Sequence, residues 1–242
     1  MSGHSKWHQI RHKKALTDAK RGQLFSKLVK EIMIAVKSGG PSPDTNARLR
    51  SALERARTEG LPKVNMERAI SRASGGGDAS SLQEFLYEAS AGGGIAILIE
   101  GITDNKNRTI AEIKKILNEY GARLAESGSL SWNFEKIGTI QFNSLENQNY
   151  SSEDLENIII ESGAQNFKTE QEIWIVETVF AELERVRSEL ERHGIKVREV
   201  GHDYKPKTTM DPPADSRPAL ENLLDALTEH DDVQEVYANT NN

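Results

Sequence analysis

The feature that most constrains the fold is the order of strand and helix patterns between residues 135 and 205. Strands are predicted near Thr139–Phe142, Asn166–Thr169, Glu172–Glu177 and Lys196–Asp203, and helices over Ser152–Ser162 and Val179–His193. The order strand, helix, strand, strand, helix, strand is typical of a ferredoxin-like domain. The sequence therefore predicts one compact α+β domain in this part of the chain.

The segments on either side of this domain are predicted to share a second sheet. Before it come strand patterns at Phe85–Glu88, Gly94–Glu100 and Leu130–Phe134, with a helix ending at Gly121 in between. After it come only a helix, Ser216–Glu229, and a short strand, Val233–Tyr237. One helix and one strand cannot form a domain alone, so we expect them to complete the earlier sheet. The ferredoxin-like domain is then an insertion.

The first part of the chain is predicted to be helical. Residues 8–37 are predicted to form one long helix or two in series, in which Leu24, Leu28, Ile32 and Val36 recur at four-residue steps. The Gly/Pro-rich stretch 38–43 ends this helical region. A second helix is expected after a cap at Asp44 or Thr45, and a third near Lys63–Ala73. The run Gly75-Gly76-Gly77 marks the domain boundary.

The predicted fold class is therefore α+β, with three domains. Residues 1–77 form a basic three-helix bundle, and residues 78–134 plus 206–242 form a discontinuous α+β domain. Residues 135–205 form the ferredoxin-like domain inserted into it.

The charge of the chain is strongly segregated. Residues 1–75 carry 16 Lys and Arg against 6 Asp and Glu, a balance of +10, whereas the remainder carries −16. Lys6, Lys13, Lys20 and Lys27 recur every seven residues and would share one helix face. Such a row of cations suits a phosphate backbone. The alternative is a solvated basic surface without a ligand.

Several polar motifs keep two interpretations. Trp7 lies among cations, which is compatible with core packing or with stacking on a base. The loop around Asp104 opens a helix, so its residues either cap that helix or recognise a partner through Asn105, Asn107 and Arg108. The four-residue spacing of His4, His8 and His12 is weak support for a metal, because cations surround them and no carboxylate lies among them.

The sequence favours a protein that is not an enzyme. It has no cysteine, no G-x-S-x-G and no HExxH motif, and neither glycine triplet has the context of a phosphate loop. We therefore expect no catalytic residue, no metal, no cofactor and no small-molecule substrate. No apolar run reaches bilayer length and a conspicuous motif begins at residue 3, so we expect a cytoplasmic protein without a membrane partner.

Several motifs resemble one family. They are Gly3-His4-Ser5-Lys6-Trp7, Asp18-Ala19-Lys20-Arg21-Gly22, Phe25-Ser26-Lys27-Leu28, Asn46-Ala47-Arg48-Leu49-Arg50, Glu67-Arg68-Ala69-Ile70, Thr103-Asp104-Asn105-Lys106-Asn107-Arg108-Thr109 and Asp231-Asp232-Val233-Gln234-Glu235-Val236-Tyr237. They closely resemble the YebC/PmpR family over essentially the whole chain, although Glu88–Gly94 and Lys205–Pro218 depart from the family pattern.

The resemblance implies the same three domains and a non-enzymatic bacterial protein related to mitochondrial translational activators. Some members bind promoter DNA as transcription regulators. Others resemble ribosome-associated translation factors that help peptide-bond formation through proline-rich stretches. The predicted function is that of a ribosome-associated translation factor that binds rRNA and tRNA, with a DNA-binding transcription regulator at promoters as the alternative, and the oligomeric state is left open. The candidate nucleic-acid-binding residues are His4, Ser5, Lys6, Trp7, Arg11, Lys13, Lys14, Lys20, Arg21, Lys27, Arg48, Arg50, Asn105, Asn107 and Arg108.

Overall fold

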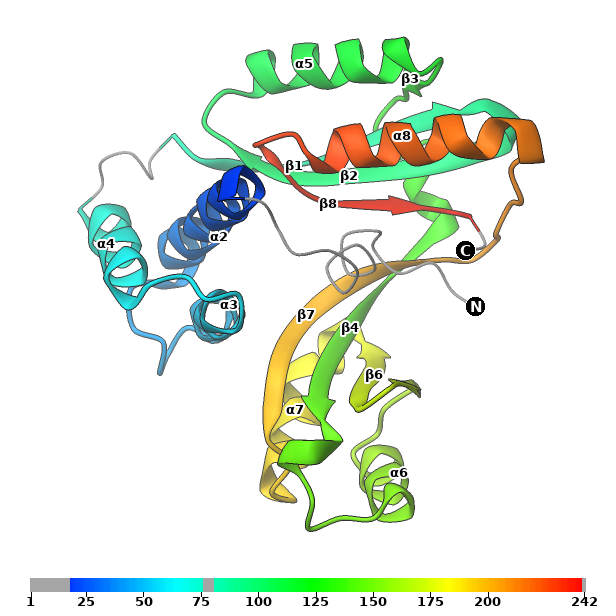
Figure 1. Cartoon of the computed structure of the whole chain (residues 1–242). Helices are drawn as coiled ribbons and strands as arrows, with labels where there is room; N and C mark the ends of the chain where they lie inside the picture. The colour runs from blue at the N-terminus through cyan, green and yellow to red at the C-terminus, as the bar shows by residue number, and fades with distance from the viewer. Residues whose placement is uncertain (1–17, 76–80, 241–242) are drawn as a thin grey trace. The chain divides into compact units, whose positions relative to one another are not determined.

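The computed structural model describes residues 18–75 and 81–240 (Figure 1). These residues divide into two compact units. The first contains the chain up to Ala52, Leu61–Glu135 and Tyr204 onwards, and the second contains Leu53–Gly60 and Lys136–Asp203. Each unit is described by itself.

Between residues 18 and 75 the structure describes three helices: α2 (Asp18–Gly39), α3 (Ala47–Thr58) and α4 (Lys63–Ser74). The apolar stripe of α2 is buried as its four-residue spacing predicts, and the helix runs without a break through Gly22. Gly40 ends it with a φ of +85°, a conformation that suits glycine. The expected cap at Asp44 or Thr45 is wrong, because the side chain of Asn46 accepts from Leu49 N at 3.0 Å.

The first sheet has the strand order β3-β1-β2-β8. Its strands are β1 (Gln83–Ala91), β2 (Ile95–Thr103), β3 (Arg123–Leu124) and β8 (Val233–Ala238). Strands β1 and β2 form an antiparallel hairpin through the short 3-10 turn η2 (Gly92–Gly94), as expected for the second glycine triplet. The C-terminal strand β8 pairs antiparallel with β2, which confirms that the chain returns to this sheet.

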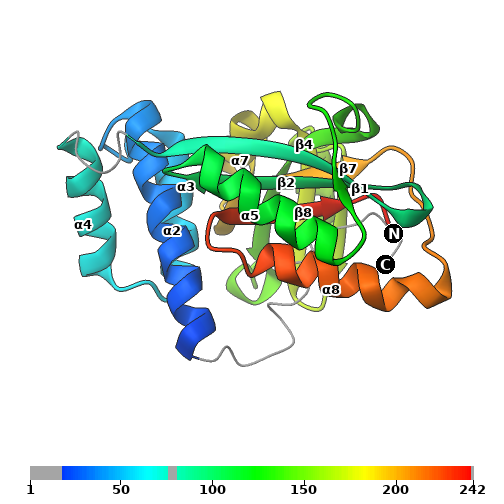
Figure 2. The same cartoon turned by 90° about the horizontal axis from the view of Figure 1, so that it is seen from above.

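Helices α5 (Lys106–Glu119) and α8 (Arg217–Thr228) lie side by side over one face of this sheet (Figure 2). Their apolar side chains, including Ile113 and Leu223, form one buried cluster with Ile97 and Ile99 of β2. Gly101 is required at the rim of this core. A Cβ atom there would lie 2.2 Å from the carbonyl oxygen of Asp232 and 2.3 Å from the ring of Phe85. The loop that carries Asp232 therefore lies directly against β2.

The second sheet is formed by the strands between β3 and β8 in the chain. They are β4 (Phe134–Asn143), β5 (Asn166–Glu170), β6 (Ile173–Val179) and β7 (Val197–Pro206), in the spatial order β5-β6-β4-β7. With α6 (Ser152–Glu161) and α7 (Leu183–Arg192), this is the predicted ferredoxin-like topology. The fold class is confirmed, whereas the domain limits at residues 77, 134 and 205 stay predictions.

The structure departs from the predicted elements at two places. The segment expected as a strand over Leu130–Phe134 is instead a 3-10 turn, η3 (Ser131–Asn133), and only Phe134 begins β4. Backbone N–H groups of this segment are bound by a distant carboxylate, which its local alternation could not indicate. The helix expected from Val179 begins as the 3-10 turn η5 (Phe180–Glu182), and α7 follows it. Two further 3-10 turns are η4 (Ser144–Glu146) and η6 (Ala214–Ser216).

Candidate nucleic-acid interface

One face of α2 contacts the segment that joins α8 to β8. The Lys27 ammonium donates to the carbonyl oxygen of Thr228 at 2.6 Å, and only 6% of this lysine is exposed. Lys20 Nζ lies 2.7 Å from Glu229 Oε1, and this hydrogen-bonded ion pair raises the pKa of Lys20. The two lysines with the seven-residue spacing thus face the protein's own C-terminal part.

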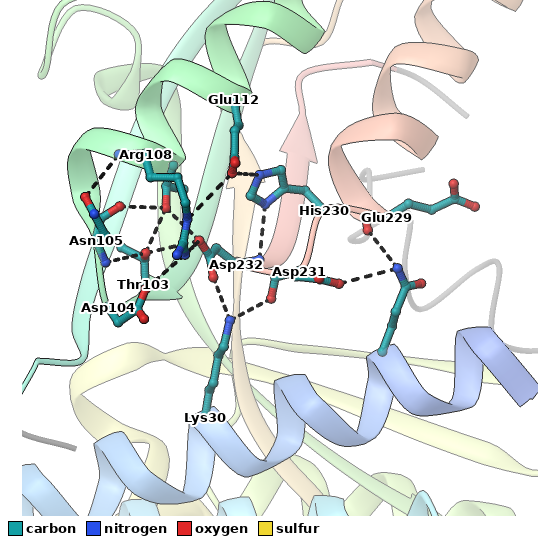
Figure 3. A network of polar contacts seen from close by, with 12 residues as sticks. Lys30, Thr103, Asp104, Asn105, Arg108, Glu112, Glu229, His230, Asp231 and Asp232 are labelled. Carbon is teal, nitrogen blue, oxygen red and sulfur yellow. Dashed lines mark hydrogen bonds and ion pairs between the residues drawn. The ribbon is translucent and has the colours of Figure 1, made fainter. Parts of the chain in front are cut away.

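Two more side chains of α2 complete this contact. Lys30 Nζ lies 2.6 Å from Asp232 Oδ1 and 3.0 Å from the carbonyl oxygen of Asp231 (Figure 3). Gln23 Nε2 lies 3.4 Å from Asp231 Oδ1. Residues 20, 23, 27 and 30 follow the alternating three- and four-residue steps of a single helix face. We call this set the docking face of α2.

Asp232 is the centre of a buried polar network. Its residue is 3% exposed, and its Oδ2 atom lies 2.8 Å from Arg108 Nη2, 2.6 Å from Thr109 Oγ1 and 3.1 Å from Thr103 Oγ1 (Figure 3). Burial by itself would raise the pKa of Asp232. The hydrogen bonds from Lys30, Thr109 and Arg108 outweigh it and hold this pKa far below its usual range. Asp232 therefore remains a carboxylate that joins α2, α5 and the β8 loop.

The Asp104 loop acts as a helix cap. The Asn105 side chain accepts from the backbone N–H groups of Asn107 and Arg108, each at 3.1 Å, and Asn105 is the N-cap of α5. The Arg108 guanidinium lies 2.9 Å from Asp104 Oδ1 and also binds Asp232. The capping interpretation is thus confirmed for Asn105. The side chain of Asn107 is exposed, so surface recognition there stays a prediction.

The two arginines of α3 proposed as contacts also bind groups of the protein. Arg48 forms a two-pronged pair with Glu84, in which Nη1 lies 3.1 Å from Oε2 and Nη2 contacts Oε1. Arg50 Nη1 lies 3.1 Å from the carbonyl oxygen of Pro43. Both guanidinium groups thus have partners within the chain, and the side chain of Arg48 is still 43% exposed.

The structure separates the predicted site residues into three groups. The candidates His4, Ser5, Lys6, Trp7, Arg11, Lys13 and Lys14 lie outside the described residues, as do His8 and His12. A second group donates hydrogen bonds to other groups of the chain, although Lys20, Arg48 and Arg108 among them are also exposed: Lys20, Lys27, Arg48, Arg50 and Arg108. The third group, Arg21, Asn105 and Asn107, is exposed, and Asn105 caps α5. The expected outward row of lysines is wrong at Lys27, because this residue is buried and its ammonium binds a backbone carbonyl.

Glu112, His230 and Asp232 bring one ligand atom each within 4.8 Å of one another. The arrangement does not favour a metal ion. His230 Nδ1 accepts from the backbone N–H of Asp232 at 3.1 Å, and His230 Nε2 lies 3.0 Å from Glu112 Oε2. Arg108 lies 3.9 Å from Glu112 Oε2 and 2.8 Å from Asp232 Oδ2, so a cation already pairs with both carboxylates.

Lys30 and Asp232 were missed as site residues, although both belong to the network that orders this region. The segregation of charge in the sequence could have indicated these residues. The basic residues 1–75 can pair with the acidic remainder of the same chain as well as with an anionic ligand. Local spacing cannot distinguish these two uses of a lysine.

The described residues contain N-terminal helices, an α+β sheet, and a ferredoxin-like topology inserted in the chain between strands of that sheet. The protein is therefore of the α+β class. Two family descriptions match the chain: "TACO1/YebC protein N-terminal domain" over residues 5–76 and "TACO1/YebC second and third domain" over residues 82–240. The chain belongs to the TACO1/YebC family.

Relatives match over nearly their whole length. A protein of Thermotoga petrophila is 44% identical over 99% of this chain and 93% of its own, and one of Thermomicrobium roseum is 41% identical over 99% and 96%. Both are named "Probable transcriptional regulatory protein". The crystal structure of a conserved hypothetical protein, Aq1575, from Aquifex aeolicus has a TM-score of 0.85 and 39% identity, and covers 98% of this chain and 97% of its own. The names support a regulatory role at the level of the family.

None of the helices that the structure describes combines the length and the apolar character needed to cross a bilayer.

Proposed function

We propose that this protein is a non-enzymatic regulator of gene expression that binds RNA on the ribosome and helps peptide-bond formation at proline-rich stretches. The choice of RNA over DNA rests on the hydrogen bonds of three arginines that were predicted to contact nucleic acid. Arg48, Arg50 and Arg108 each donate to a carboxylate or carbonyl of the chain. Specific DNA regulators most often read guanine with an arginine that is free to bind two base atoms. RNA recognition by shape and phosphate contact needs no such reader.

Exposed cations remain for phosphate contact. Arg21 on α2 and both Lys63 and Arg68 on α4 have exposed side chains. Lys63 lies 3.6 Å from Glu67, but a surface pair of this kind is weak and does not prevent a phosphate contact. Together with the candidates between His4 and Lys14, these residues form the proposed contact surface.

A second candidate function is regulation of transcription at promoters. It is favoured by the names of the relatives, which describe probable transcriptional regulatory proteins. The two functions differ in the nucleic acid that is bound. Crosslinking in cells, followed by sequencing of the bound nucleic acid, distinguishes them: we expect rRNA and tRNA, and enrichment of promoter DNA would contradict the ribosomal proposal.

A charge-reversal pair tests the location of the contact. Lys6→Glu with Lys13→Glu is expected to remove sedimentation with ribosomes, because these lysines are placed in the proposed contact surface. The matched control is Lys114→Glu with Lys115→Glu, which makes the same change of charge at exposed positions of α5. If the two double variants lost sedimentation with ribosomes equally, a contact specific to the basic residues 1–77 would be refuted. Lys27 is not changed, because a carboxylate at its buried position would disturb the docking face.

A further inference from the structure

Trp132 is an exposed side chain whose position is fixed by a hydrogen bond within the chain. It lies in the turn η3, and 66% of its surface is exposed. Its indole N–H donates to the carbonyl oxygen of Ser129 at 2.7 Å. The polar atom of the side chain is therefore satisfied within the chain. The part that faces solvent is a flat aromatic surface with no hydrogen-bonding requirement.

The chain before Trp132 is fixed by a buried carboxylate. Glu88, on β1, is 4% exposed and accepts from three backbone N–H groups: Gly128 at 2.6 Å, Leu130 at 2.6 Å and Ser131 at 3.0 Å. Burial alone would raise the pKa of Glu88, but these hydrogen bonds outweigh it and lower the pKa. Hydrogen bonds to a charged acceptor are strong, so the Glu88 carboxylate fixes the conformation of this turn without a bound partner.

The residue after Trp132 is fixed as well. Asn133 is 6% exposed, and its side chain pairs with the backbone of Thr208 in both directions, at 3.1 and 3.2 Å. Its carbonyl oxygen accepts from Lys207 N at 2.7 Å. Lys207 is exposed. The segment that is hydrogen-bonded to Asn133, the residue after Trp132, therefore carries an exposed cation.

From this geometry we propose that Trp132 is a stacking platform for an unpaired base of a bound RNA strand. The inference rests on the proposed function and names a contact outside the basic bundle. Base stacking needs only an aromatic face, whereas a tryptophan in a protein interface commonly uses its N–H toward the partner. In this proposal Lys207 contacts the neighbouring phosphate, because it is an exposed cation whose backbone is bonded to Asn133. Glu126 and Glu135 are also exposed in this stretch, so stacking and not net charge supplies the attraction.

The test is binding of the full-length protein to a short unstructured RNA oligonucleotide, measured as a dissociation constant at two or more salt concentrations. Trp132→Ala is expected to weaken binding about tenfold, and Trp132→Phe, which keeps an aromatic face, to weaken it about threefold or less. The tenfold factor is expected to be the same at each salt concentration, because stacking releases no counterions. Leu145→Ala, another exposed apolar residue, is the control and should not change affinity.

The outcomes separate the two proposals. If the wild-type protein binds no RNA, the proposed function fails and the platform fails with it. If the wild-type protein binds RNA and Trp132→Ala binds equally well, only the platform is refuted. Equal losses in Trp132→Ala and Trp132→Phe would also overturn it, since an aromatic face would then not suffice. Unchanged RNA affinity with lost ribosome sedimentation would show that Trp132 meets a protein, which contradicts stacking on a base.

Discussion

Replacing Asp232 by asparagine tests whether this carboxylate joins α2 to the first sheet. The Asp232 side chain is 4% exposed and carries ion pairs with Lys30 and Arg108. Removing one partner of a buried ion pair costs about 3–5 kcal/mol. Lys30 is 21% exposed and Arg108 is 45% exposed, so both can gain water, and asparagine keeps one acceptor oxygen. We therefore expect a loss of about 2–3 kcal/mol in the free energy of unfolding.

The assay is urea unfolding followed by circular dichroism, with hydrogen exchange to locate the change. In thermal unfolding of a chain of this size, a loss of that amount lowers Tm by roughly 4–12 °C. Exchange is expected to accelerate in α2 and in the loop before β8, because both lose the same anchor. Asp231→Asn is the matched control: this neighbour is exposed and contacts Gln23 at 3.4 Å, so its cost should stay within about 0.5 kcal/mol. A cost for Asp232→Asn no larger than for Asp231→Asn would refute the reasoning.

Two further predictions concern pH and the cap of α5. The pKa of Asp232 is depressed in the folded protein, so its stabilisation is complete above the unfolded value of about 3.9 and is lost as pH falls toward the folded value. The difference in unfolding free energy between wild type and Asp232→Asn should therefore narrow between about pH 5 and pH 2, and a constant difference would exclude the carboxylate charge as its source. Asn105→Ala should cost about 1 kcal/mol, because two backbone N–H groups lose their acceptor. Asn107→Ala is its control in the same urea titration, and equal costs would show that capping is not the cause.

Local pattern predicted much of the fold because the relevant contacts are local or follow periodicity. The four-residue apolar spacing of α2 and the order of strands around the ferredoxin-like domain are of this kind. The return of the C-terminal helix and strand to the first sheet was predicted because one helix and one strand cannot form a domain alone, but the pairing of β8 with β2 was not predicted.

The site could not be predicted in the same way. Lys30 and Asp232 are 202 residues apart, and nothing in the sequence near either residue indicates the other. The same holds for Glu88, which binds the turn before Trp132 from 40 to 43 residues away. In both cases a buried carboxylate bonds to donors brought close only by the folded chain. Periodicity identified Lys20 and Lys27 as one helix face, but not whether that face meets solvent or protein.

The internal contacts change what the charge asymmetry means. The balance of +10 in residues 1–75 suggests a polyanion partner, yet Lys20, Lys30 and Arg48 are each paired with a carboxylate of the acidic remainder. Part of the asymmetry is thus neutralised within the first unit. Each phosphate contact to a single strand contributes about 0.7 to the slope of log affinity against log salt. The slope should therefore be smaller than the formal count of cations implies, because cations that are already paired add little when RNA binds.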